Sequence, residues 1–452
     1  MKLTKISLVA ALLVGSSAFA IDNVKVSGDA KLYYSTTDKK KGYGAISDKD
    51  SLFGKDNSAA DAGVNLNVTA DLVKNDLVSV SAGAGYTILS TLGLENNFVS
   101  NVWAGAHTAT AGTGANFGNV TLPDGTDIGG AKVENANWMN EAWVAVSLNK
   151  SSKSTLKLGR MELDTPLAFT EKWSIEKNTF EAAVVVNQDI PDTTVVAAFV
   201  GNGNGTESLG QDAQSNIINV AGTGQDLAMA PVVNADGDFT TFGTNGAYVF
   251  GVVNNSFKPL TAQAWYYELP SLASAYWLEA DLKCQQVKGL LAGIQYTSTK
   301  VNGSDSSGTF ALMAGYEMKD MVTVKLAYAQ TSDKGDFHGG NIATNSGLSK
   351  LYTEAWWNYG YVTQTDTTSY KLSIESPVNG IFDLGVYYTS ADQDKSNKVP
   401  APKDLSEFTM TASKSFGPLD TKLAYIYADA QDGYKDTDDK SSTIQAYLTL
   451  NF

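Results

Sequence analysis

The last residues of the chain, Ser442–Phe452, alternate strictly between apolar and polar side chains. One face holds Ile444, Ala446, Leu448, Leu450 and Phe452, and the other holds Thr443, Gln445, Tyr447, Thr449 and Asn451. A period of two predicts a β-strand. The length suits a tilted strand that crosses a membrane, which needs about 9–11 residues.

The same pattern repeats along the chain from Ile21: about ten alternating residues, a short polar turn, a second strand, and then usually a longer polar loop. Eight short turns and nine other connections require eighteen strands. Leu351–Trp357 would add an odd strand, so we assign it to a long loop. We therefore predict an all-β protein: a transmembrane antiparallel β-barrel of about 18 strands, with long extracellular loops, formed by residues 21–452 as one domain.

Met1–Ala20 has the features of a secretory signal: Lys2 and Lys5, a short apolar core, and a small-residue cleavage pattern at Ala18–Ala20. Removing it lowers the formal net charge from −15 to −17. A charge this negative argues against a nucleic-acid partner, because phosphate binding needs a basic surface. We expect export through the periplasm to the outer membrane.

Tyrosines mark one end of the predicted strands. In strands that would run outward, the last outward-facing residue is repeatedly a tyrosine, at Tyr34, Tyr86, Tyr266, Tyr296, Tyr328, Tyr388 and Tyr427. Its ring is apolar and its hydroxyl prefers water, so such a row indicates a membrane–water boundary. This distinguishes a membrane barrel from a soluble sandwich, which also alternates.

The opposite strand faces should line the lumen, and they carry many charges. By parity these are Asp29, Asp71, Glu141, Glu181, Glu279, Asp281, Glu317, Glu375, Asp383 and Asp420, against Lys25, Lys31, Lys157, Lys283, Lys325, Lys371 and Lys422. Unpaired buried charge is very costly, so we predict a wet lumen. A closed barrel filled by salt bridges is the alternative.

The connection Glu162–Thr179 is apolar in its middle and poor in glycine, so we expect it to fold inward. The only arginine of the chain, Arg160, precedes it. An arginine opposite carboxylates creates a transverse field in a narrow pore. We predict a constriction formed by Arg160, Glu162, Asp164, Glu171, Lys172 and Glu176. Parity with Leu158 would instead turn Arg160 outward, unless the strand bulges at Gly159.

Several segments resemble known porins. The pair Gly159-Arg160 before the third loop is similar to a pair in porins generally, and the ending on Phe452 resembles that of bacterial outer-membrane barrels. Phe180–Ala183, Trp265–Pro270 and Ala275–Asp281 resemble the OprD-type porins, including the major porin of Campylobacter. The resemblance implies passage of small hydrophilic solutes, a trimer, and Phe452 as the signal for the barrel assembly machinery. The single arginine and acidic excess depart from the basic-lined members.

Other functions have less support. An enzyme would need a histidine base, and both His107 and His338 lie in glycine-rich loops away from plausible partners. The acidic loop from Asp429 to Asp439 could hold calcium, but its spacing matches no EF-hand. Adhesion through the long external loops, or a structural barrel, is the alternative. We predict a porin without cofactor, moderately cation-selective, in contact with outer-membrane lipid and lipopolysaccharide.

Overall fold

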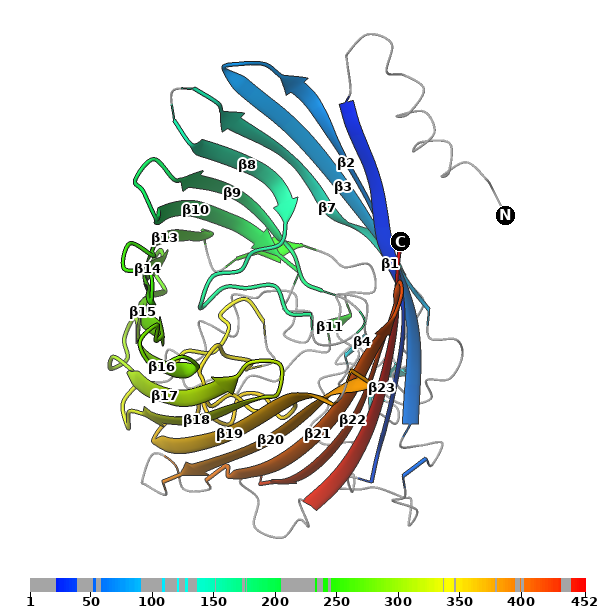
Figure 1. The fold of residues 1–452 in the computed structure, drawn as a ribbon, viewed down its shortest axis with the longest axis vertical. Coiled ribbons are helices and arrows are strands. Elements are labelled where there is room, and N and C mark those ends of the chain that lie inside the picture. The colour runs from blue at the N-terminus through cyan, green and yellow to red at the C-terminus, as the bar shows by residue number, and fades with distance from the viewer. Residues whose placement is uncertain are drawn as a thin grey trace.

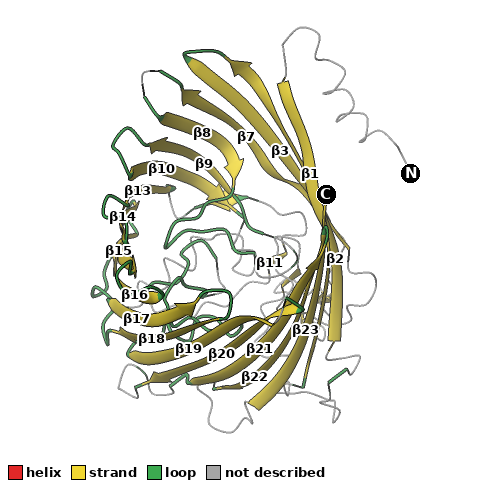
Figure 2. Cartoon of the chain, viewed as in Figure 1, coloured by secondary structure: helices red, strands yellow, loops and turns green. Residues whose placement is uncertain are grey.

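The structure, a computed structural model, describes residues 22–38, 52–53, 58–90, 108–109, 120–121, 127–128, 136–150, 152–172, 175, 177–204, 232–233, 239–242, 245–335, 337–344, 347–378, 380–394, 399, 402–431 and 440–452. The predicted signal segment Met1–Ala20 lies outside these residues. No helix in the described ranges is long and apolar enough to cross a membrane. Figure 2 shows that the described elements are strands joined by loops.

Eighteen strands of eight or more residues form one closed barrel, as the sequence predicts (Figure 1). They are β1 (Asp22–Thr37), β2 (Ser58–Lys74), β3 (Val78–Ser90), β7 (Ala136–Leu148), β8 (Ser154–Met161), β9 (Phe180–Asn187), β10 (Thr193–Gly203), β13 (Ala247–Asn254), β14 (Leu260–Leu269), β15 (Ala273–Lys283), β16 (Leu290–Val301), β17 (Thr309–Met318), β18 (Val322–Thr331), β19 (Thr367–Val378), β20 (Phe382–Gln393), β21 (Leu405–Phe416), β22 (Leu419–Ala430) and β23 (Lys440–Asn451).

Five further strands of two residues each lie within the long connections. β12 (Thr240–Thr241) extends the main sheet beside β10. The others form two small pairs: β4 (Thr108–Ala109) with β11 (Val232–Val233), and β5 (Val120–Thr121) with β6 (Asp127–Ile128).

The two ends of the chain close the barrel. β1 pairs antiparallel with both β2 and β23, and its register with β23 runs from Asp29–Asn451 to Thr37–Thr443. Phe452 completes the seam, because its backbone exchanges hydrogen bonds with that of Gly28 at 2.8 and 3.0 Å. Gly28 also gives the Phe452 ring room, since a Cβ there would lie 2.7 Å from Cζ of that ring. The closed sheet leaves no unpaired edge.

The strand faces separate as the alternation predicts. On β23, Leu448 and Leu450 are 39% and 43% exposed on the outer face, whereas Gln445 is fully buried on the inner one. Tyrosine side chains pack in pairs on the outer face, where Tyr276 lies against Tyr296 at 5.8 Å and Tyr328 against Tyr370 at 5.3 Å between ring centroids. An apolar outer wall with an aromatic band is the surface that a bilayer covers.

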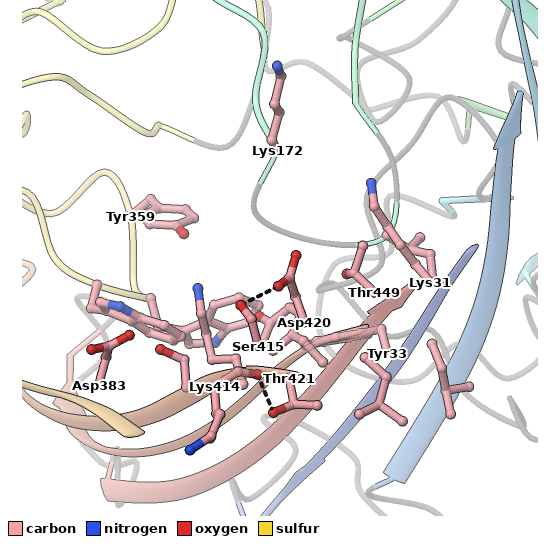
Figure 3. Close-up of a pocket in the computed structure, with 18 residues that line it drawn as sticks. Lys31, Tyr33, Lys172, Tyr359, Asp383, Lys414, Ser415, Asp420, Thr421 and Thr449 are labelled. Carbon is pink, nitrogen blue, oxygen red and sulfur yellow. Dashed lines mark hydrogen bonds between the residues drawn. The ribbon is translucent and has the colours of Figure 1, made fainter. Parts of the chain in front are cut away.

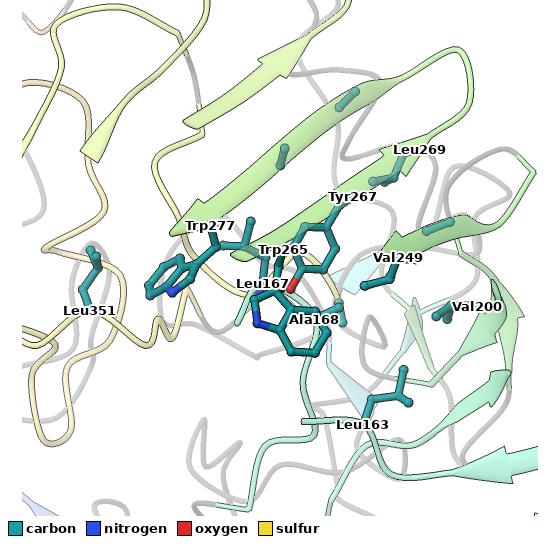
Figure 4. Packing of buried hydrophobic residues seen from close by; sticks show 14 of the residues in the cluster. Leu163, Leu167, Ala168, Val200, Val249, Trp265, Tyr267, Leu269, Trp277 and Leu351 are labelled. Atoms are coloured by element: carbon teal, nitrogen blue, oxygen red, sulfur yellow. Dashed lines mark hydrogen bonds between the residues drawn. The ribbon is translucent and has the colours of Figure 1, made fainter. Parts of the chain in front are cut away.

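Two of the loops that the structure describes lie inside the barrel, and only one of them was expected to do so. The third loop, residues 162–179 between β8 and β9, lies inside as predicted, and the β18–β19 loop, residues 332–366, lies beside it (Figure 1). Leu351–Trp357 belongs to this second loop, which confirms its assignment outside the strands. Part of the interior is therefore a packed apolar cluster, in which Leu167, Tyr267 and Trp277 are fully buried (Figure 4).

Candidate functional site in the barrel lumen

The third loop begins with a tight turn that packs against the wall. Asp164 and Phe169 form a β-bridge, and the Thr165 hydroxyl donates to the Ala168 carbonyl at 2.7 Å. The turn presents Leu167 to the wall, where its backbone N–H donates to the Tyr267 hydroxyl at 3.2 Å. Apolar burial and saturated turn hydrogen bonds thus hold the loop inside the barrel.

The third loop and the β18–β19 loop hold each other. The Ile342 N–H donates to the Leu167 carbonyl at 2.8 Å. The Asn341 amide donates to the Phe169 carbonyl at 2.9 Å and to the Glu171 carboxylate at 2.8 Å. Glu171 is only 1% exposed, so it is a structural acceptor between the loops.

The β18–β19 loop is clamped to the wall by a carboxylate of β21. Glu407 is 1% exposed. One of its oxygens accepts the N–H groups of Trp356 and Trp357 at 2.8 and 3.0 Å, and the other accepts the N–H and side-chain amide of Asn358, each at 2.8 Å. This carboxylate fixes the backbone that carries the two tryptophans.

A cluster of lysines and carboxylates lies where the third loop meets β7. The Lys177 ammonium lies 2.7 Å from Glu141 and also pairs with Glu162, which in turn pairs with Lys172. Burial alone would raise the pKa of Glu162, but Lys177 and Lys172 offset this and hold it below its usual range. Burial would lower the pKa of Lys177, but Glu162 and Glu141 raise it above its usual range.

Arg160 does not lie in this cluster, which corrects the predicted constriction. It pairs with Ala142 and Glu181 in an unbroken register, so the strand adds no residue at Gly159 despite the φ of 120° there. Arg160 therefore shares the outward row with Leu158, which is 45% exposed. Its guanidinium bonds Glu181 at 2.7 Å and lies 4.0 Å from the centre of the Phe239 ring.

The same register corrects the position of Glu181, which was expected to line the lumen. Its neighbours two and four residues along β9 on the same row are Ala183 and Val185, and Val185 is 40% exposed on the outer wall. The transverse field expected from Arg160 therefore needs another source inside the barrel.

The other predicted constriction residues divide into three groups. Glu162 and Lys172 belong to the charged cluster, Asp164 pairs with Lys350 of the β18–β19 loop, and Glu171 joins the loops. Glu176 lies outside the described residues.

The predicted lumen residues on β15 to β18 lie on the inner wall. The Trp277 indole donates to Glu279 and the Tyr352 hydroxyl donates to Asp281, both at 2.7 Å. Lys283 pairs with Glu317 at 2.7 Å, and Lys325 is half-buried beside Gly315. Asp281 on β15 thus gives the β18–β19 loop a second anchor on the wall, besides Glu407 on β21.

A pocket of about 540 Å³ remains between the inner loops and the wall formed by β20, β21, β22, β23 and β1 (Figure 3). The wall side was predicted by parity, since Lys31, Asp383, Asp420 and Lys422 all line it. The loop side consists of Lys172, Ile175, Trp356, Trp357 and Tyr359, of which only Lys172 was among the predicted pore residues. The apolar run Ala355-Trp356-Trp357 inside an otherwise polar loop is the sequence feature that could have predicted a buried or inward-facing segment here.

A closed barrel with an apolar, tyrosine-banded outer wall and a charged lumen defines the class: an outer-membrane β-barrel with the architecture of a channel.

Solved structures narrow this class. The chain matches no protein-family model and no curated protein by sequence. It is similar to OpdK of Pseudomonas aeruginosa, with a TM-score of 0.64 and 14% identity over 96% of this chain and 99% of that one. OccAB1 of Acinetobacter baumannii gives 0.65 and 13% over 96% and 97%. OccK8 (OprE) of P. aeruginosa gives 0.64 and 13% over 96% and 98%. The fold is that of the OprD- and Occ-type porins.

Proposed function

We propose that this barrel is a porin: a water-filled channel of the outer membrane through which small hydrophilic solutes diffuse passively. One observation carries the proposal. A pocket lined by charged and hydroxyl side chains remains beside the two inner loops, within a barrel whose outer wall is apolar. A purely structural barrel would gain from filling this space with apolar side chains, as the opposite part of the interior does.

The inner loops narrow the lumen. The charged cluster of Glu141, Glu162, Lys172 and Lys177 forms one side of the narrow section in this proposal, in place of Arg160. Solutes would be selected by size and by these fixed charges. The acidic excess of the chain, with a formal net charge of −15, supports a moderate preference for cations.

The remaining predictions belong to the same proposal. Met1–Ala20 acts as an export signal, Ile21–Phe452 forms one barrel domain, and Phe452 serves the barrel assembly machinery. The barrel associates as a homotrimer, as in the Campylobacter-type branch, and contacts lipid and lipopolysaccharide. No catalytic role or cofactor is assigned. The loops that an adhesin would use lie mostly outside the described residues, and no contact in the described part favours that alternative.

Swelling of liposomes that contain the refolded barrel tests solute passage. The proposal predicts rapid swelling with small neutral sugars and slower swelling as the sugars become larger. A second barrel with Glu407→Gln serves as the comparison. This substitution frees the β18–β19 loop and should change the largest sugar that the barrel admits. A folded barrel that admits no sugar would contradict the proposal.

A further inference from the structure

The lumen wall beside the pocket carries an ordered arrangement of opposite charges. In one row across the sheet, Asp383 of β20 pairs with Ser413 of β21, which pairs with Lys422 of β22. In the next row, nearer the short β21–β22 turn, Asp420 of β22 pairs with Thr449 of β23, which pairs with Lys31 of β1. Each row thus places a carboxylate two strands from an ammonium.

These spacings are too wide for direct pairing along a row. Neighbouring strands lie about 4.8 Å apart, so the backbone positions of Asp383 and Lys422 are separated by about 9.6 Å. Within the described part of the chain, neither Asp383 nor Lys422 forms an ion pair. The Lys422 ammonium lies 5.9 Å from the centre of the Tyr447 ring. Both charges are therefore free to bind a solute.

The other lysines on the pocket are engaged. Lys31 lies 3.4 Å from Asp29, Lys172 pairs with Glu162, and the Lys414 ammonium donates to the Gly380 carbonyl at 3.2 Å. The Asp420 carboxylate is oriented by the Ser415 hydroxyl and the Asn451 amide, which donate to it at 2.5 and 2.7 Å. The groups left to meet a solute are one ammonium and two carboxylates. An anion alone would face both carboxylates, and a cation alone would face Lys422.

An aromatic surface faces this charged wall. Trp356, Trp357 and Tyr359 of the β18–β19 loop all line the pocket, and Figure 3 shows Tyr359 across from Asp383 and Ser415 of the wall. The ring centroids lie 6.4 Å apart for the two tryptophans and 6.2 Å apart for Trp357 and Tyr359. Because Glu407 fixes the backbone of residues 356–358, this surface is held in place before a solute arrives, which lowers the ordering cost of binding.

We propose that this pocket binds zwitterionic solutes that carry an aromatic ring, of which an aromatic α-amino acid is the smallest example. The solute carboxylate meets Lys422, its ammonium meets Asp383, and its ring packs on the tryptophans. A volume of about 540 Å³ suits such a molecule. The inference rests on the proposed function, since it names a solute class for the same lumen, and it assigns the transverse field to this wall.

Fluorine NMR of the folded barrel in detergent micelles tests the site without relying on conduction. The probes are 4-fluorophenylalanine and its two single-charge analogues, 3-(4-fluorophenyl)propionate and 2-(4-fluorophenyl)ethylamine, with alanine as a competitor that lacks the ring. We expect the amino acid to bind about tenfold more tightly than either analogue, because each analogue leaves one pocket charge unpaired. Alanine should compete only weakly.

Substitutions assign the binding to these residues. Lys422→Gln and Asp383→Asn should each weaken binding of the amino acid about tenfold and remove its advantage over the analogue that lacks the matching charge. Trp357→Ala should weaken all ring-bearing probes. The matched controls are Lys258→Gln and Asp192→Asn, which break an exposed ion pair between the β9–β10 and β13–β14 turns, outside the pocket, and should leave binding unchanged. Heat-modifiable mobility on gels confirms that each variant is folded.

Two results would overturn the proposal. If the propionate analogue binds as tightly as the amino acid and Asp383→Asn has no effect, the pocket is a simple anion site. If no probe binds a barrel that conducts ions, the site is absent although the porin remains. Conversely, a barrel that binds the amino acid but does not conduct would contradict the porin and leave the binding site standing.

Discussion

Lys177 is the cation that joins the charged end of the third loop to the barrel wall. Its side chain is 13% exposed and contacts two carboxylates, Glu141 at 18% and Glu162 at 31% exposure. Lys177→Met keeps the length of the side chain but leaves both carboxylates without their common partner. Breaking a buried ion pair costs about 3–5 kcal/mol.

Partial exposure lowers this cost. Because water still reaches Glu162, we expect about 2–3 kcal/mol, which shifts the local equilibrium between docked and undocked loop by about 30- to 150-fold. The barrel itself should remain folded, since Leu167 and its neighbours stay buried against the wall. The narrow section also loses one positive charge, so permeation should shift toward cations.

Hydrogen exchange and the reversal potential measure these two effects. The amides of residues 177–179 should exchange faster in Lys177→Met, and a salt gradient should give a reversal potential displaced toward that of the cation. Lys177→Arg should restore both. Lys150→Met, which breaks an exposed pair with Asp76, is the matched control. Unchanged exchange together with an unchanged reversal potential would refute the role of Lys177.

Three further predictions follow from the loops and the seam. Glu407→Gln replaces an acceptor of two hydrogen bonds by a donor, which costs about 2–4 kcal/mol locally, so the amides of residues 356–358 should exchange faster without loss of the barrel. The depressed pKa of Glu162 means that its anchoring energy is present above pH 4.5 and is lost as the pH falls through its lower folded value; current noise should therefore rise in acid and stay low at neutral pH. Deleting Phe452 removes the two hydrogen bonds to Gly28, so folding yield should fall, as gel mobility would show, whereas Phe452→Tyr should fold normally.

The strands could be predicted because their physics is local. Alternation along β23 alone assigned Leu448 to the outer face and Gln445 to the inner one, and the structure confirms both. The strand count followed from turns and loops of contrasting length. It also required Leu351–Trp357 to be placed in a loop, which parity of the strand number decided.

The orientation of Arg160 and the path of the β18–β19 loop could not be predicted, because both depend on contacts between segments that are distant in the sequence. Whether Arg160 faces in or out turned on one glycine, and a positive φ at Gly159 was compatible with either a bulge or an unbroken register. The inward path of the β18–β19 loop depends on Glu407, a residue some 50 positions away from the backbone it holds. No local pattern in residues 332–366 encodes that contact.

Single-channel recording of the refolded barrel in a planar bilayer under a salt gradient tests the central claim most directly. The account predicts stable open steps with a reversal potential on the cation side, because it proposes a water-filled lumen in a chain whose formal net charge is −15. A correctly folded barrel that inserts and stays silent would contradict the assignment of a water-filled channel.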